Sequence, residues 1–311
     1  MTTAFIFPGQ GSQAVGMGAA LAAASGHARE VFAEVDAALG EDLSGLMREG
    51  PAETLTLTRN AQPAIMANAI ATLRVLEREH GVVLAERAAF VAGHSLGEYT
   101  ALCAAGALDL ATTARLLRLR GEAMQAAVPV GVGAMAAMGM DWDDAVALAA
   151  EAAEDEVCAA ANDNMPGQVV ISGHKAAVER AIGVAKAKGV RRAMLLPVSA
   201  PFHCTLMQPA ADAMAAALDE AELRAPAVPV FANVTAAPAR DPAEIRRLLV
   251  AQVTGVVRWR ESVLAMAAAG VDRFVEFGGT VLGGMVKRIV PGVPIVSLVS
   301  ADDVAAFARE F

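Results

Sequence analysis

Apolar and polar positions alternate in two ways along this chain. Short apolar segments bounded by turn residues are typical of buried strands, whereas apolar residues three or four positions apart are typical of helices with one buried face. The first pattern predicts strands at residues 3–7, 88–92, 228–232, 273–276 and 295–298. The second predicts helices at residues 17–39, 61–79, 96–105, 110–124, 205–217, 242–253 and 260–269. Alternating strands and helices favour an α/β fold with a mostly parallel sheet flanked by helices.

The stretch 128–197 has a pattern of its own. It predicts a strand at 133–140, a helix at 141–153 with an acidic cap, strands at 157–161 and 168–172 joined by a turn at 162–167, a helix at 175–188 and a strand at 193–198. The order β-α-β-β-α-β is the ferredoxin-like arrangement. We therefore expect a ferredoxin-like small subdomain at 128–197, inserted into a large domain formed by residues 1–127 and 198–311.

Composition and charge narrow the class of protein. The chain has 311 residues, of which 55% are hydrophobic, and this excludes a disordered protein. Its net charge of −9 argues against nucleic acid as the main partner. No apolar run reaches the roughly 18 residues of a membrane span, and the N-terminus lacks a signal-peptide pattern. Cys103, Cys158 and Cys204 lack the spacing of a disulfide framework or a metal site. We expect a cytoplasmic protein with no metal and no membrane partner.

The sequence GHSLG at residues 93–97 lies where a predicted strand ends and a predicted helix begins. In that setting G-x-S-x-G is typical of a tight turn that exposes the serine hydroxyl in hydrolase-like folds. The helix N-terminus stabilises negative charge there, and the Leu96 N–H is the natural donor to an oxyanion. We interpret Ser95 as a nucleophile in a hydrolase-like large domain, with a chance turn as the alternative.

A serine nucleophile needs a base, and the chain has 5 histidines. His94 adjoins Ser95, but its side chain should point away from the hydroxyl. Surface, helix-end or turn positions are expected for three others: His27, His80 and His174. His203 lies in the proline-containing segment 197–204 and follows the serine in chain order. It is the candidate base, and a structural loop histidine is an equal alternative.

Arg120 is the most informative charge in the sequence. Other polar residues of the helix predicted at 110–124 form one stripe: Arg115, Arg118, Glu122 and Gln125. Arg120 instead shares the apolar face with Leu116, Leu117, Gly121 and Met124. A guanidinium on an apolar face needs a carboxylate partner, which is either one of the chain's own 34 acidic residues or the substrate. A substrate carboxylate would select a dicarboxylic acyl group over acetyl.

Further motifs occur in order over essentially the whole chain. They are GQGSQ at 9–13, GHSLGE at 93–98, Arg120-Gly121, the segment 162–168 followed by VVISG at 169–173, PFH at 201–203, and Gln252 with VRW at 257–259. Together they resemble the stand-alone bacterial malonyl-CoA:acyl carrier protein transacylases.

The resemblance implies roles in the reaction. Ser95 would be the acylated nucleophile and His203 its base. The backbone N–H groups of Gln10 and Leu96 would form the oxyanion hole. Gln252 would orient His203 through its main-chain carbonyl, which agrees with the lack of a clear acidic third residue.

The resemblance also implies the residues that bind the substrate. Arg120 would pair with the free malonyl carboxylate, and Met124 and Phe202 would line the acyl site. Some members have a small residue where this chain has Phe202. A bulky ring beside the base should crowd a methyl branch, so we expect malonyl to be preferred over methylmalonyl.

The implied activity is ping-pong transfer of malonyl from malonyl-CoA to the phosphopantetheine thiol of acyl carrier protein, which supplies fatty acid synthesis. No cofactor is expected, because malonyl-CoA is a substrate. The carrier is acidic, so a basic patch that includes Lys287 and Arg288 should dock it. Three alternatives stay open: a serine esterase or thioesterase, a non-catalytic carrier-binding module, and a transacylase of malonate decarboxylation or polyketide assembly.

Overall fold

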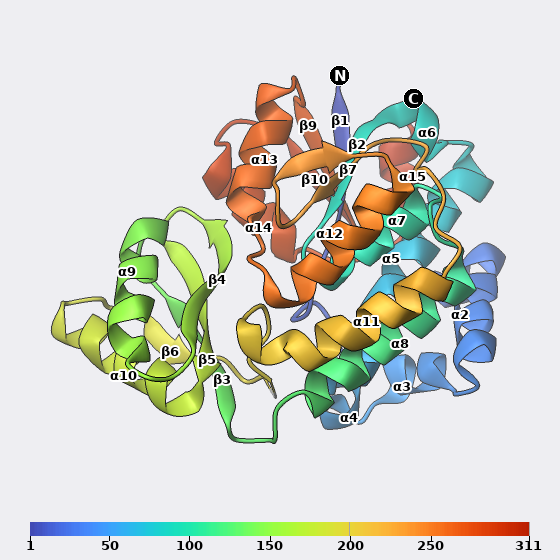
Figure 1. Cartoon of the computed structure of the whole chain (residues 1–311). Helices are drawn as coiled ribbons and strands as arrows, with labels where there is room; N and C mark the ends of the chain where they lie inside the picture. The colour runs from blue at the N-terminus through green and yellow to red at the C-terminus, as the bar shows by residue number, and fades with distance from the viewer. Residues whose placement is uncertain (199, 311) are drawn as a thin grey trace.

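The computed structural model describes residues 1–198 and 200–310. Its larger part is an α/β fold with a six-stranded sheet (Figure 1). The strands are β1 (Thr3–Phe7), β2 (Ala88–Gly93), β7 (Val230–Ala232), β8 (Ala237–Ala239), β9 (Arg273–Phe277) and β10 (Ile295–Leu298). Their order is β10-β9-β1-β2-β7-β8, and every neighbouring pair is parallel except β7 and β8. The mostly parallel sheet predicted from the sequence is confirmed.

Helices flank this sheet on both faces. They are α1 (Ala19–Ala24), α2 (Gly26–Leu39), α3 (Leu43–Glu49), α4 (Ala52–Thr56), α5 (Thr58–His80), α6 (Leu84–Arg87), α7 (Leu96–Ala104), α8 (Leu110–Ala126), the 3₁₀ turn η1 (Thr205–Met207), α11 (Gln208–Glu220), α12 (Pro242–Thr254), α13 (Trp259–Ala268), α14 (Val281–Ile289) and α15 (Ala301–Ala308). None of the helices within residues 1–198 and 200–310 combines the length and apolar character that a membrane crossing needs.

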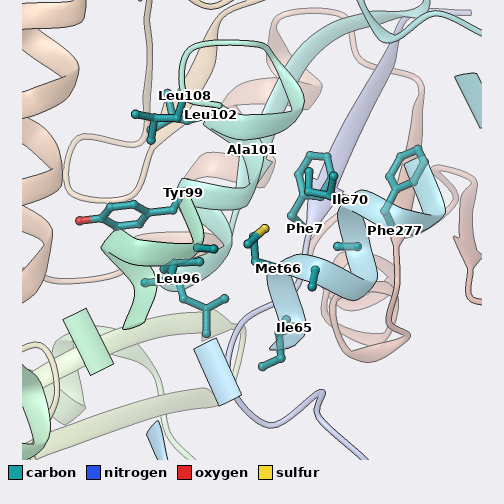
Figure 2. Close-up of a cluster of buried hydrophobic side chains, with 14 of the residues drawn as sticks. Phe7, Ile65, Met66, Ile70, Leu96, Tyr99, Ala101, Leu102, Leu108 and Phe277 are labelled. Atoms are coloured by element: carbon teal, nitrogen blue, oxygen red, sulfur yellow. The ribbon is translucent and has the colours of Figure 1, made fainter. Parts of the chain in front are cut away.

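Alternate residues of β1 point into two separate hydrophobic cores, as the period of two in a strand requires. Phe5 and Phe7 pack in the larger core, which α5 and α7 cover. Figure 2 shows Phe7 near Ile70 of α5 and Phe277 of β9 in this core. Ala4 and Ile6 pack on the other face in a core that α13 and α14 cover. The apolar runs of the sequence are therefore buried on both sides.

A second, four-stranded sheet lies beside the larger part (Figure 1). Its strands are β3 (Gly133–Met138), β4 (Cys158–Met165), β5 (Gln168–His174) and β6 (Ala193–Leu195), and its helices are α9 (Trp142–Ala153) and α10 (Lys175–Ala187). The strands pair antiparallel in the order β4-β5-β3-β6. The chain order within this sheet is thus β-α-β-β-α-β.

The strand β4 is longer than the sequence pattern predicts, and the turn predicted at 162–167 is wrong for its first four residues. Those residues belong to β4, because the chain pairs there with a distant loop. The N–H of Val257 donates to the oxygen of Ala161 at 2.9 Å, and the N–H of Asp163 donates to the oxygen of Val257 at 3.0 Å. Arg260 adds an ion pair with Asp163 at 2.9 Å. These bonds join the second sheet to the larger part.

Three other predictions about elements need correction. The helix predicted at 17–39 is divided at Ser25, whose backbone is extended and whose side chain accepts from the N–H of Ala28 to begin α2. Asp141 is the N-cap residue of α9, as predicted, but its side chain makes no cap hydrogen bond to the helix; its carboxylate accepts from the N–H of Gly167 at 3.2 Å. The strand predicted at 193–198 ends at Leu195. Residues 199 and 311, which the predicted large domain includes, lie outside the described residues.

Candidate active site

Ser95 lies at the tight turn between β2 and α7. Its φ of 54° and ψ of −112° are backbone angles that residues with a side chain rarely adopt. A Cβ added at Gly93 would lie 1.9 Å from the backbone of Gly97, and one added at Gly97 would lie 2.3 Å from the oxygen of Phe7. The turn therefore requires both glycines of the G-x-S-x-G pattern.

Ser95, His203 and Gln252 are connected in this order by two hydrogen bonds. The Oγ of Ser95 lies 2.8 Å from Nε2 of His203, and Nδ1 of His203 lies 2.9 Å from the main-chain oxygen of Gln252. A carbonyl oxygen can only accept, so Nδ1 carries the hydrogen and Nε2 accepts from the serine hydroxyl. The prediction that Gln252 holds His203 through its main chain agrees with this geometry.

The imidazole of His203 is held neutral. Burial, followed by the positive charge of Arg120, lowers the pKa of His203 to about 3. At neutral pH its Nε2 can therefore accept a proton from Ser95. The protonated ring that results is costly in this setting, and such a ring returns its proton readily to a leaving group.

Arg120 is buried beside the serine, with 1% of its surface exposed. Its Nη2 donates to Oγ of Ser95 at 3.2 Å and to Oε1 of Gln252 at 2.8 Å, and its Nη1 donates to Oε1 of Gln62 at 2.9 Å. The guanidinium lies 5.7 Å from the ring centre of Tyr99. No carboxylate of residues 1–198 or 200–310 forms an ion pair with it. Within these residues the guanidinium of Arg120 has no direct counter-ion, and the Nε–H of Arg120 has no acceptor.

The buried carboxylate of Glu98 stabilises the turn at Ser95 through hydrogen bonds to neighbouring residues. Its Oε2 accepts from the N–H of Asn233 and from Nε2 of Gln252, each at 2.9 Å. The side chain of Asn233 accepts from the N–H of Ser95 at 2.8 Å and donates to the oxygen of Gly93 at 2.7 Å. Burial raises the pKa of Glu98 to about 7 against the opposing effect of these hydrogen bonds. The network fixes Ser95 and Gln252 relative to each other.

Two backbone N–H groups near Ser95 are available to bind an oxyanion. The Leu96 N–H is the first of α7, and the N–H of Gln10 belongs to the loop after β1. Neither donates to an acceptor within the described part of the chain. Gln10 and Leu96 line the same cavity as Ser95, and the oxyanion hole stays a prediction.

Residues of the site line a cavity of about 310 Å³, which lies between the larger part of the protein and the second sheet. Ser95, Arg120 and His203 line it together with Met124 and Phe202, the two residues that the resemblance assigned to substrate binding besides Arg120. The sulfur of Met124 lies 3.8 Å from Nε2 of Gln62, so it also packs against the amide that holds Arg120. Met135, Asn162 and Val170 line the cavity from the second sheet.

The other histidines have other partners or positions, and His174, predicted to lie in a turn, is the last residue of β5. Nε2 of His94 lies 2.8 Å from Oδ1 of Asn164, which ties the turn to the second sheet. Nδ1 of His174 accepts from the N–H of Val157 at 2.9 Å. His27 is a half-buried residue of α2, and His80 is an exposed residue at the end of α5.

Sequence reasoning missed three residues of the site: Gln62, Glu98 and Asn233. Gln62 carried a usable signal, because an amide on a helix that is apolar nearly all round needs a buried partner. Glu98 belonged to a quoted motif but was given no role. Asn233 had no signal, since its partners lie far away in the sequence.

Residues 1–198 and 200–310 contain no group of three or more His, Cys, Asp or Glu side chains that could hold a metal ion.

Comparison with known proteins gives a consistent result. Residues 4–279 match the family described as acyl transferase domain. The malonyl CoA-acyl carrier protein transacylase of Escherichia coli K12 is 50% identical over 289 residues, which cover 92% of each chain. The crystal structure of an acyl-carrier-protein-S-malonyltransferase from Bartonella henselae matches with a TM-score of 0.97 and 52% identity, covering 100% of this chain and 99% of that one. A malonyl-transacylase solved in complex with a type II polyketide synthase acyl-carrier protein matches with a TM-score of 0.96 and 40% identity over 100% of both chains.

Proposed function

The chain belongs to the acyl transferase domain family, and from this premise we propose that it transfers the malonyl group from malonyl-CoA to the phosphopantetheine thiol of acyl carrier protein. The names of the Escherichia coli and Bartonella henselae relatives support malonyl as the acyl group. The relative solved with its carrier protein supports the acceptor. One observation carries the proposal: Arg120 is a buried guanidinium 3.2 Å from Oγ of Ser95, without an ion pair in the described part of the chain.

In the first half-reaction, Oγ of Ser95 attacks the thioester carbonyl while its proton passes to Nε2 of His203. The N–H groups of Gln10 and Leu96 stabilise the oxyanion of the tetrahedral intermediate. The carbon–sulfur bond then breaks, and coenzyme A leaves with the proton held by His203. The product is malonyl-Ser95.

In the second half-reaction, the phosphopantetheine thiol gives its proton to His203 and attacks the ester carbonyl. The bond to Oγ of Ser95 breaks, and the serine recovers the proton. Malonyl is now a thioester of the carrier protein. No cofactor takes part. The malonyl group stays bound to Ser95 after coenzyme A has left and until the carrier thiol attacks, which defines a ping-pong mechanism.

Arg120 selects the acyl group. A guanidinium binds a carboxylate through two parallel hydrogen bonds, and in a buried site this pair discriminates strongly against an acyl group that lacks the carboxylate. The bond from Nη2 to Ser95 places the cation where the free end of a short acyl group would lie. Gln62 and Gln252 hold the guanidinium with neutral oxygens, so its charge stays available to the substrate.

Intact-protein mass spectrometry after mixing with malonyl-CoA or acetyl-CoA tests the proposal. We expect the wild-type protein to gain one malonyl group and little acetyl. Ser95→Ala should gain neither, and Arg120→Ala should lose the preference for malonyl. Equal malonyl and acetyl adducts on the wild-type protein, or hydrolysis of malonyl-CoA that exceeds transfer to the carrier, would contradict the proposed function.

A basic patch on α14 is proposed to dock the acidic carrier protein. Lys287 and Arg288 are exposed in the last turn of α14. Val281 and Met285 of the same helix line the active-site cavity, so a carrier bound there would lie close to the serine. Reversing both charges (Lys287→Glu with Arg288→Glu) should raise KM for the carrier and leave KM for malonyl-CoA unchanged. An unchanged KM for the carrier would remove this patch from the proposal.

The domain organisation is part of the same proposal. We assign residues 1–127 and 198–311 to a hydrolase-like catalytic domain and residues 128–197 to a ferredoxin-like subdomain. Support comes from the G-x-S-x-G turn after a parallel strand and from the antiparallel order β4-β5-β3-β6. We also propose a role in fatty acid synthesis and a cytoplasmic location, as the resemblance implies.

A further inference from the structure

Glu98 is connected to Arg120 through one amide. The Nη2 of Arg120 donates to Oε1 of Gln252 at 2.8 Å, and Nε2 of the same amide donates to Oε2 of Glu98 at 2.9 Å. Both charged side chains are 1% exposed. An amide between a cation and an anion is polarised by both and relays part of their attraction. The protein therefore stabilises its buried cation through neutral groups, and the Nε–H of Arg120 keeps no acceptor within the described residues.

We propose that Glu98 is a positioning residue that serves as the relayed counter-charge of Arg120 and takes up a proton when a substrate carboxylate binds to Arg120. The inference rests on the proposed function, because it requires an acyl group with a free carboxylate at that guanidinium. The carboxyl of Glu98 accepts from Asn233 and Gln252 and has no hydrogen bond to the Ser95 hydroxyl within the described residues, so it acts through Gln252.

The physical reason is competition between two anions for one buried cation. A second negative charge within the same low-dielectric site disfavours ionisation of the first. The pKa of Glu98 already lies at about 7 because of burial, so the carboxyl can gain a proton near neutral pH. Binding of the malonyl carboxylate raises that pKa further. By linkage, protonation of Glu98 then strengthens binding of the carboxylate.

Few other charged groups face Glu98. Arg120 comes from α8, and Tyr99 of α7 stays neutral because burial raises the pKa of its hydroxyl. The neighbouring α12 and the loop after β7 contribute the neutral amides Gln252 and Asn233. β1, β2 and α5 pack against α7 without presenting an ionised side chain to the carboxyl. His203 also faces Arg120, but its pKa of about 3 places its titration at lower pH.

The expected sign follows from the linkage. Affinity for malonyl-CoA falls as pH rises through the pKa of Glu98, by up to about tenfold for each unit by which binding raises that pKa. Acetyl-CoA shares the coenzyme A phosphates but has no free carboxylate. Its affinity therefore lacks the extra pH dependence, and the ratio of the two affinities isolates the contribution of Glu98.

Calorimetry on the Ser95→Ala protein, which binds but cannot be acylated, tests the proposal. Affinities for malonyl-CoA and acetyl-CoA are measured from about pH 6 to about pH 9, in buffers that differ in ionisation enthalpy so that proton uptake is counted. Glu98→Gln keeps an acceptor oxygen but cannot ionise, and it should abolish the malonyl-specific pH dependence.

Glu276→Gln is the matched control. Glu276 is also fully buried, burial also raises its pKa, and it accepts from the N–H groups of Leu282 and Gly283 at 2.9 and 2.8 Å without contact to Arg120. The Glu276→Gln protein should keep the malonyl-specific pH dependence. A dependence that survives in Glu98→Gln, or is lost in both variants, would overturn the proposal.

Proton uptake keeps the proposal testable if Glu98→Gln does not fold. The Ser95→Ala protein alone should take up about half a proton more with malonyl-CoA than with acetyl-CoA near neutral pH. Equal uptake for the two ligands overturns the inference. Measuring how much malonyl the Arg120→Ala protein gains from malonyl-CoA shows whether the role of Glu98 or the proposed function has failed. If malonyl loading depends on Arg120 but uptake is equal, only the role of Glu98 is wrong; if loading does not need Arg120, both proposals fail.

Discussion

Helix α8 carries two buried arginines, two positions apart, whose charges are satisfied in different ways. Arg118 is 8% exposed and donates to a carboxylate oxygen of Glu41 at 2.9 Å and to the side chain of Asn60. Arg120 is 1% exposed and, within residues 1–198 and 200–310, donates to the amides of Gln62 and Gln252 and to the hydroxyl of Ser95 but to no carboxylate. Burial of a cation therefore does not by itself indicate a binding site. The missing direct counter-ion does.

The comparison also corrects a detail of the sequence pattern. Arg118 belongs to the polar stripe of α8, yet it is buried against α5 by its contact with Asn60. Residues two apart on a helix lie on different faces. One arginine consequently reaches the carboxylate of Glu41, while the other reaches the serine.

The largest expected effect comes from Arg120→Ala. Removing one member of a buried, hydrogen-bonded charge pair costs about 3–5 kcal/mol, so kcat/KM for malonyl-CoA should fall by a factor between about 10² and 10⁴. The kcat/KM for acetyl-CoA should change far less, because acetyl makes no such pair. Steady-state transfer to the carrier protein measures both. Equal losses for the two substrates would make Arg120 a structural residue like Arg118.

Arg118→Ala should affect stability instead of activity. We expect the free energy of unfolding to fall by about 1–2 kcal/mol, a value kept small because Glu41 is half exposed. The kcat/KM for malonyl-CoA should stay within about twofold of wild type. Urea denaturation and transfer kinetics give the two numbers. A large loss of activity in a protein of normal stability would break the contrast between the arginines.

The charge of Arg120 should also be visible in the pH dependence of the base. His203 has a pKa of about 3, mainly from burial and secondly from Arg120. In Arg120→Gln the second cause is removed, so the pKa of His203 should rise while staying below its ordinary value of about 6.5. The acidic limb of kcat/KM for acetyl-CoA, a substrate that does not need the guanidinium, should shift to higher pH by the same amount. An unmoved limb would mean that the two groups are not electrostatically coupled.

The smallest expected effect tests whether selection extends beyond the carboxylate. Phe202 is 8% exposed and lines the cavity beside His203. The wild-type protein should prefer malonyl-CoA to methylmalonyl-CoA, and Phe202→Ala should raise the relative rate with methylmalonyl-CoA about fivefold, since one methyl group is at stake. Competition between the two thioesters measures the ratio. Equal rates in the wild-type protein would remove Phe202 from the specificity of the site.

The sequence by itself determined the local features of this protein. The strand β1 was predicted with its observed bounds, because an uninterrupted apolar run between turn residues fits a strand buried on both faces. The turn at Ser95 was predicted because the whole G-x-S-x-G pattern lies within five consecutive residues. Both of its glycines, Gly93 and Gly97, are needed because the backbone packs closely there. Arg120 stood out because helical periodicity alone placed it on an apolar face.

Only the tertiary structure decided which distant groups meet. The extension of β4 depends on Val257, and the network under Ser95 joins Glu98 to Gln252 across 154 positions of the chain. Whether Arg118 or Arg120 met a carboxylate could not be predicted either, because Glu41 lies 77 positions from Arg118. Periodicity reports which face of an element is buried. It carries no information about the element that packs against that face, and hydrogen bonds and charge pairs between elements are set by that packing.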